Sequence, residues 1–198
     1  MTKTIDYYYT HTSPWTYLGH DRFLKIAAAA GATVNFKPAS MEVIFPQSGG
    51  LPLPKRAPQR QAYRMMELRR WHDFLGIPIT FEPKHFPTAS TPAALVAVAA
   101  GQAGLDMGKL SGAILRAVWV EERNIADEDT LVAIANEQGF DGPALLEASK
   151  GDEAKAGFEA NTAEAMARNV FGAPTYVYKD ENFWGQDRLD FVERALAK

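Results

Sequence analysis

The clearest indication of the fold comes from residues 5–19, which read IDYYYTHTSPWTYLG. Ile5 to Tyr9 is aromatic and rich in residues that favour strands, and it stops at a short polar segment, which predicts a first strand. Ser13 is a typical helix N-cap, and Pro14 is a typical first helical residue. The stretch therefore predicts a strand that leads directly into a helix.

The residues that follow predict a β-α-β opening. Apolar side chains continue at roughly helical spacing from Tyr17 until Gly31, which is well placed to end the helix. Thr33 to Lys37 then reads as a second strand. A helix of this length between two strands indicates a parallel pair, because an antiparallel pair needs only a hairpin turn.

The middle of the chain has helical composition from the Pro- and Gly-rich stretch Pro46 to Pro58 up to about Arg168. Residues at the boundaries such as Asp, Thr, Pro and Gly suit helix starts and ends. The predicted helices are one that contains Glu67 to Phe74 and ends near Gly76, then Thr91 to Ala103, Met107 to Arg123, Asp127 to Gln138, Gly142 to Lys150 and Asp152 to Arg168.

The end of the chain returns to strand-forming residues. Thr175 to Tyr178 predicts a strand, Lys179 to Asn182 a turn, Phe183-Trp184 a second strand, and Asp187 to Ala197 a last helix. The fold class is therefore α/β, with β-α-β and β-β-α halves. We expect residues 1–40 and 170–198 to form one domain in two segments, with 41–169 as a helical insertion.

Composition limits the function classes. The 198 residues are 46% hydrophobic and carry a net charge of -3, with no concentration of basic residues, so a nucleic-acid partner is not expected. The longest apolar run, Ala93 to Ala100, is too short to span a membrane, and no signal peptide is visible. We expect a soluble cytoplasmic protein. No cysteine is present, which excludes disulfides, thiolate metal sites and a cysteine nucleophile.

The four histidines, His11, His20, His72 and His85, are dispersed and lack the spacing of metal ligands, so no metal site is expected. His11 is a candidate acid or base because it lies two residues before Ser13. The commoner outcome for such a residue is an exposed loop histidine.

Residues 7–19 resemble the N-terminal motif of the 2-hydroxychromene-2-carboxylate isomerases, relatives of the kappa-class glutathione transferases in the DsbA-like superfamily. Three further blocks carry the same resemblance, in the same order: Arg60 to Tyr63 with Leu68 to Trp71, Phe171 to Thr175, and Trp184 to Leu189. The resemblance implies a thioredoxin-like fold with an all-helical insertion and a glutathione-dependent isomerase. It also implies a homodimer.

Ser13 has two interpretations. The plain one is a helix N-cap and nothing more. In relatives that exchange disulfides, a Cys-x-x-Cys pair stands where this chain has Ser13-Pro14-Trp15-Thr16. The resemblance implies that Ser13 instead holds the thiol of bound reduced glutathione as a thiolate, helped by the positive end of the helix. The thiolate then adds to the conjugated system of the substrate and later leaves unchanged.

The other expected glutathione contacts come from the end of the chain. Pro174 could be an ordinary trans turn proline, whereas the resemblance implies a cis bond, with Ala173 pairing its backbone with the cysteinyl part of glutathione. Asp187 is either a helix cap or a partner for the γ-glutamyl ammonium group. Kappa-class relatives commonly carry Ser-Asp here, so Gln186 is a departure that still offers an amide hydrogen bond.

The substrate carboxylate and phenolate need cations, which Lys55 and Arg56 could supply from the loop after Gly49, although such charges are most often solvated. Arg64, Arg69 and Arg70 have weaker claims. Trp15 and Tyr63 are candidates to wall a flat aromatic substrate, although aromatic residues on a helix are more often core.

Two other functions stay open from the sequence. A kappa-class-like glutathione transferase would bind the same cofactor but release a stable conjugate. A non-catalytic glutathione- or peptide-binding scaffold would keep the fold without turnover. The presence of Ser13, Ala173-Pro174 and Asp187 favours an enzyme over the scaffold.

Overall fold

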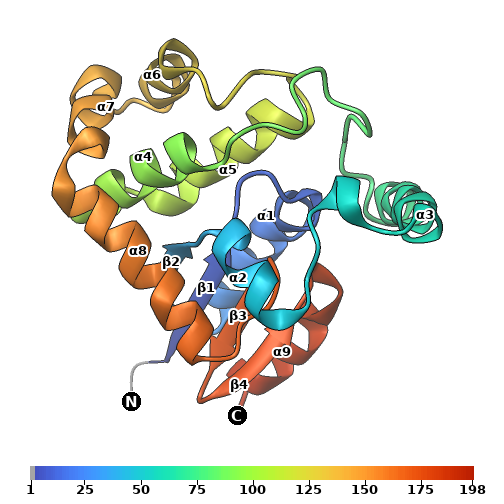
Figure 1. Ribbon diagram of the computed structural model, residues 1–198. Helices are drawn as coiled ribbons and strands as arrows, with labels where there is room; N and C mark the ends of the chain where they lie inside the picture. The colour runs from blue at the N-terminus through green and yellow to red at the C-terminus, as the bar shows by residue number, and fades with distance from the viewer. Residues whose placement is uncertain (1–2) are drawn as a thin grey trace.

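The computed structural model describes residues 3–198, so residues 1–2 of the first predicted domain segment lie outside it. A four-stranded sheet lies below an arch of helices (Figure 1). The elements in chain order are β1 (Thr4–Tyr9), α1 (Pro14–Ala29), β2 (Thr33–Pro38), α2 (Met41–Ser48), η1 (Leu53–Lys55), α3 (Pro58–Leu75), α4 (Thr91–Gln102), α5 (Met107–Trp119), α6 (Glu128–Glu137), α7 (Gly142–Lys150), α8 (Asp152–Ala167), β3 (Thr175–Tyr178), β4 (Glu181–Trp184), η2 (Gln186–Arg188) and α9 (Leu189–Leu196).

The sheet has the strand order β2-β1-β3-β4. β1 pairs with β2 in parallel and with β3 antiparallel, so Tyr7 lies opposite both Phe36 and Tyr176. β3 and β4 form an antiparallel pair. The predicted β-α-β and β-β-α halves are therefore confirmed, and with them the α/β, thioredoxin-like fold with helices inserted between its halves.

Both faces of the sheet are covered, which explains the continuous apolar run in β1. Tyr7 and Tyr9 pack with residues of α1 and α9, including Phe23 and Val192, on one face. Tyr8 lies on the other face with residues of α2 and α8, including Ile44. Because a strand places alternate side chains on opposite faces, one aromatic segment supplies two cores.

The inserted helices have a core of their own. α4 to α8 pack around buried side chains such as Trp119, Ile114 and Leu131. α3 projects to one side in Figure 1, and Leu68 is its buried residue. α8 returns along the sheet, where Lys37 binds Glu164 at 2.5 Å. The division of the chain at residues 41 and 169 stays a prediction.

Three element boundaries and one unpredicted helix differ from the sequence prediction. The helix predicted over Met107 to Arg123 ends at Trp119, whose carbonyl accepts a hydrogen bond from the Thr80 N–H instead of continuing the helix. α2 was not predicted, since it contains Pro46. β4 begins at Glu181 because Lys179 and Asp180 form a two-residue turn with φ of 48° and 65°. The last α-helix starts at Leu189, after the single 3₁₀ turn η2.

Within residues 3–198, the structure contains no helix with both the length and the apolar character needed to cross a bilayer.

Gly19 allows the end of the chain to approach α1 closely. A Cβ at this position would lie 2.7 Å from Cβ of Gln186 and 2.9 Å from the Tyr176 hydroxyl. Both distances are shorter than ordinary van der Waals contact, so a side chain at position 19 would push η2 away from α1. The small residue therefore fixes where the corner at Gln186-Asp187 sits relative to the start of α1.

We expect Gly19→Ala to lower the free energy of unfolding by about 1–3 kcal/mol, because overpacking moves backbone in a filled core. Chemical denaturation measures the change. Gly112→Ala is the matched control, since its Cβ would meet the His20 ring at a milder 3.3 Å. The gain in helix propensity, about 1 kcal/mol, should largely offset that contact. An equal effect of the two substitutions would contradict this account.

Candidate functional site

The pairing of β1 with β3 brings the start of α1 beside the loop that precedes β3. The two strands are antiparallel, so the residues after Tyr9 and the residues before Thr175 meet at the same end of the sheet. Ser13 and Ala173 are 160 positions apart in sequence, and they are joined here by a hydrogen bond. The Ala173-Pro174 peptide bond is cis, which confirms the prediction for this proline.

Ser13 is the N-cap of α1. Its Oγ accepts a hydrogen bond from the Thr16 N–H at 3.2 Å and donates to the Ala173 carbonyl at 3.2 Å. The residue is buried, with 9% of its surface exposed. The capping role is therefore confirmed. It does not compete with a second role, because the hydroxyl proton is free to turn to another acceptor.

The start of α1 is suited to an anion. Its first turn contains no acidic residue, so the positive end of the helix is not neutralised by its own side chains. The N–H of Ala173 has no hydrogen-bond partner among residues 3–198. This corner thus offers a hydroxyl donor, a helix terminus and a free backbone N–H within one small region.

The corner at the start of the last helix is connected to the same loop. The Gly185 N–H donates to the Pro174 carbonyl at 2.8 Å, which places Gln186 and Asp187 next to the cis-proline. Asp187 is exposed, and its carboxylate accepts from Arg188 at 2.7 Å. Ser13 and Ala173 are therefore in contact, and the corner that carries Asp187 adjoins Pro174.

Gln186 lies at this corner but turns its side chain into the fold. It is 1% exposed, and its Oε1 accepts from the Arg22 guanidinium at 2.7 Å. Its Nε2 has no partner among the described residues. The Gln186 side chain links α1 to η2 through its bond to Arg22. The amide hydrogen bond to glutathione expected of Gln186 would have to come from this buried side chain.

The four expected substrate residues lie in different surroundings. Lys55 is exposed, whereas Arg56 is half-buried, donates from Nε to the Leu51 carbonyl at 2.7 Å and lies over the Phe45 ring. Trp15 is half-buried in the first turn of α1. Tyr63 is 54% exposed on α3. Of the two basic residues, Arg56 is the one that packs against the protein.

An aromatic pair beside the cis-proline was not predicted from the sequence. The rings of Phe171 and Trp184 are in edge contact with their centroids 4.8 Å apart, and each residue is about half exposed. The absence of a side chain at Gly172 makes room for the Trp184 indole. Both residues belong to the motifs that carry the family resemblance. The sequence does not reveal that their side chains are exposed beside the site.

The expectation that His11 is exposed was wrong. The residue is 0% exposed, its ring packs edge-on against Tyr9, and neither ring nitrogen has a hydrogen-bond partner among residues 3–198. Burial, and to a smaller extent the neighbouring His20, lowers the pKa of His11 to about 3. His11 is therefore neutral near pH 7 and a poor base. No cluster of metal-ligand side chains occurs in residues 3–198 either.

The comparison with protein families agrees with this geometry. The model for the DSBA-like thioredoxin domain matches residues 4–197. This chain belongs to the DSBA-like thioredoxin domain family. The sequence is 29% identical to a 2-hydroxychromene-2-carboxylate isomerase from Sphingobium xenophagum over 99% of both chains. It is 24% identical to human glutathione S-transferase kappa 1, over all of this chain and 92% of the relative.

Solved structures extend the likeness. A structure of 2-hydroxychromene-2-carboxylate isomerase superposes on this DSBA-like chain with a TM-score of 0.85 and 25% identity, over 98% of this chain and 94% of the other. The cytosolic disulfide reductase DsbM from Pseudomonas aeruginosa, solved with GSH, matches with a TM-score of 0.70 and 20% identity, over 98% and 100% of the two chains. This second likeness shows the fold alone.

We expect His11 to weaken the DSBA-like fold in acid. Its folded pKa of about 3 lies below the ordinary value of 6.5, so the unfolded chain takes up the proton first as pH falls. The free energy of unfolding should then decrease between about pH 6.5 and pH 3, by at most about 1.4 kcal/mol per pH unit for this residue.

Denaturant titrations across this pH range should give a flatter profile for His11→Leu than for the parent. His20 is also buried with a lowered pKa and stays in both proteins, so a residual slope is expected. Identical slopes in the two proteins would show that His11 does not control the acid response.

Proposed function

We propose that this protein is a glutathione-dependent cis-trans isomerase acting on 2-hydroxychromene-2-carboxylate or a related intermediate of aromatic degradation. The observation that carries the proposal is the meeting of Ser13, at the start of α1, with the Ala173-Pro174 loop in a chain without cysteine. Full-length similarity to proteins named as this isomerase supports the reaction and the substrate class.

The residues at this corner fit glutathione. Ala173 has an N–H without a partner in the described part of the chain, beside its carbonyl, and this is the pair of groups that an extended peptide backbone recognises. Asp187 presents an exposed carboxylate for an ammonium group. Ser13 and the start of α1 are placed to receive the sulfur. When bound, glutathione supplies the nucleophilic sulfur that the chain lacks.

Ser13 stabilises negative charge on the sulfur by turning its hydroxyl proton. The present bond to the Ala173 carbonyl, 3.2 Å, is longer than a good O–H···O bond, so little free energy is lost when the hydroxyl turns away. The Thr16 N–H continues to donate to the Ser13 oxygen at 3.2 Å and holds it in place. Donors fixed in advance stabilise charge without reorganisation.

The substrate is held by residues from the other side of the site in this proposal. Arg56, with Lys55 beside it, offsets charge on the substrate oxygens, and Trp15 in the first turn of α1 offers an aromatic wall. Tyr63 on α3 contributes a second aromatic surface if the α3 side closes over the substrate. The protein is proposed to work in the cytoplasm as a homodimer. Sedimentation velocity tests the dimer directly.

Two alternatives use the same corner. The kappa 1 relative supports a glutathione transferase, which differs in releasing a conjugate and consuming the thiol. A scaffold would bind glutathione without turnover. Thiol-disulfide exchange by the chain itself is excluded, because residues 13–16 read SPWT and no cysteine is present.

We expect Ser13→Ala to reduce kcat of the isomerisation by about 100-fold, as loss of one fixed donor to a developing anion does elsewhere. Glutathione binding, followed by calorimetry, should persist. The substrate spectrum with and without glutathione measures turnover, and a thiol assay measures consumption. Ser90→Ala is the control, since Ser90 also precedes a helix but its side chain makes no capping bond.

Three results would redirect the proposal. Consumption of one thiol per turnover indicates the transferase. Glutathione binding without any spectral change indicates the scaffold. Unchanged kcat in Ser13→Ala, in a protein that does isomerise, would show that Ser13 is a cap and nothing more.

A second prediction concerns the γ-glutamyl end. Asp187→Asn should weaken glutathione binding by about 2- to 5-fold, because an exposed ion pair contributes up to about 1 kcal/mol. Binding of an analogue that lacks the γ-glutamyl amino group should not change. Asp190→Asn, an exposed carboxylate in the next turn, is the control. Equal losses for glutathione and the analogue would contradict an ammonium contact at Asp187.

A further inference from the structure

Arg64, on α3, is a half-buried cation with no oxygen partner among residues 3–198. Its guanidinium makes one hydrogen bond, to Sδ of Met65 at 3.7 Å, and no carboxylate of residues 3–198 lies within 4.0 Å of it. Every other half-buried basic side chain in the described chain has an oxygen acceptor: Lys3, Arg22, Lys37, Arg56, Arg123 and Arg168. Arg64 is the exception.

A second half-buried guanidinium, that of Arg56, lies in the segment just before α3. Arg56 is also half-buried and has a carbonyl partner but no carboxylate among the described residues. Burial, and then repulsion from Arg56, lowers the pKa of Arg64 to about 10. Two partly desolvated like charges without a counter-ion are unfavourable, and an anion bound between them removes that cost.

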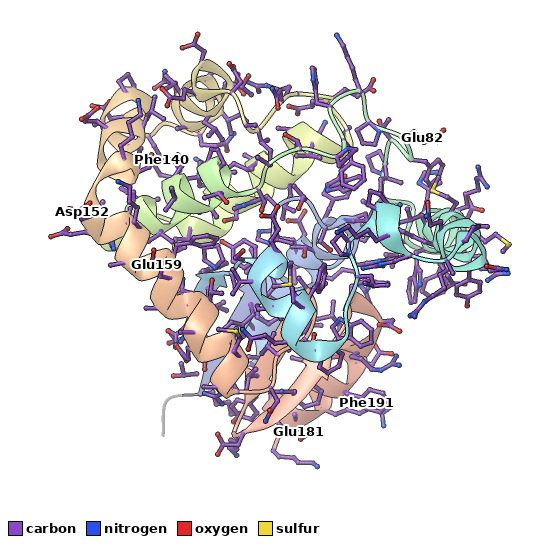
Figure 2. The ribbon with its side chains drawn as sticks, viewed as in Figure 1. Glu82, Phe140, Asp152, Glu159, Glu181 and Phe191 are labelled. Atoms are coloured by element: carbon purple, nitrogen blue, oxygen red, sulfur yellow. The ribbon has the colours of Figure 1, made fainter. Side chains whose placement is uncertain are left out.

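A chain of contacts links Arg64 to the segment before α1. Its guanidinium lies 5.7 Å from the centre of the Phe86 ring, and that ring is 5.0 Å from Trp119. The Trp119 indole N–H donates to the carbonyl of His11, two residues before Ser13. The Tyr17 hydroxyl also donates to the Pro78 carbonyl at 2.7 Å, so α1 holds the segment that follows α3. Figure 2 labels Glu82 on this segment.

We propose that Arg64, joined by Arg56, is the residue that binds the carboxylate of the substrate and so selects acids over neutral aromatic compounds. The inference rests on the proposed function for the nature of the substrate. A planar guanidinium fork matches a carboxylate in two parallel hydrogen bonds, which a lysine cannot do. With its carboxylate held at α3, the substrate would direct its reacting carbons toward Ser13.

The competing explanation is packing alone. Arg69, five residues further along α3, lies 5.7 Å from the centre of the Phe81 ring, as Arg64 does from Phe86. Arg69 is exposed, however, so water solvates its charge. The pair therefore offers a matched comparison, with the same side chain and the same kind of ring contact but different burial.

The experiment measures binding of two unreactive probes, chromone-2-carboxylate and uncharged chromone, to the intact protein with and without glutathione. Calorimetry should show tighter binding of the carboxylate. Arg64→Gln should weaken carboxylate binding by about 10- to 100-fold, which is typical for hydrogen bonds to a charged group, and leave chromone unchanged. Arg69→Gln should change neither. Arg64→Lys should keep part of the preference, because it keeps the charge but loses the fork.

Two outcomes would overturn the proposal. Equal binding of the two probes to the parent protein would mean that no carboxylate subsite exists. Equal loss of both probes in Arg64→Gln, with Arg64→Lys showing no preference for the carboxylate, would mean that Arg64 only packs. Neither outcome depends on turnover. Failure of the proposed function appears separately, as absence of glutathione-dependent isomerisation by a parent protein that still prefers the carboxylate probe.

Discussion

The antiparallel pairing of β1 with β3 is the interaction on which the site depends. Nearly the whole chain separates the two strands, and the register that sets Tyr7 against Tyr176 also sets the start of α1 against the cis-proline loop. The aromatic residues of β1 are fully buried on both faces, so the register cannot slip by one residue without exposing them. Packing of the two strands in these cores positions the segments that follow and precede them, and Ser13 donates a hydrogen bond to the Ala173 carbonyl.

The charged groups around the site complement the backbone arrangement that the sheet imposes. The start of α1 has no acidic residue in its first turn, and the α2-α3 side carries two half-buried guanidinium groups without carboxylate partners among residues 3–198. Elsewhere in the described chain, half-buried cations such as Lys37 and Arg168 pair with Asp6 or Glu164. The start of α1 and the Arg64 guanidinium thus offer positive charge to two anionic groups, as binding of a thiolate and a carboxylate would require.

The sequence predicted those features that depend on local chemistry. Ser13-Pro14 signals a helix start, Gly31 ends that helix with a φ of 62°, and a run of aromatic residues marks β1. Features that depend on packing were not predictable. Whether Lys55 or Arg56 turns inward, why Gln186 faces Arg22, and that His11 is buried are all decided by neighbours from distant segments. α2 was not predicted because it contains Pro46. Tertiary contacts stabilise this helix rather than the helix propensity of its residues.

The ionisation of bound glutathione is the most direct test of this account. Because the chain has no cysteine, the ultraviolet absorbance of a thiolate in the complex comes from glutathione alone. A pH titration of the complex, with the protein alone as baseline, gives the pKa of that thiol. The account predicts a value well below the ordinary one of about 8.5, returning toward it in Ser13→Ala. A bound thiol with an unshifted pKa would contradict the claim that Ser13 and the start of α1 activate glutathione.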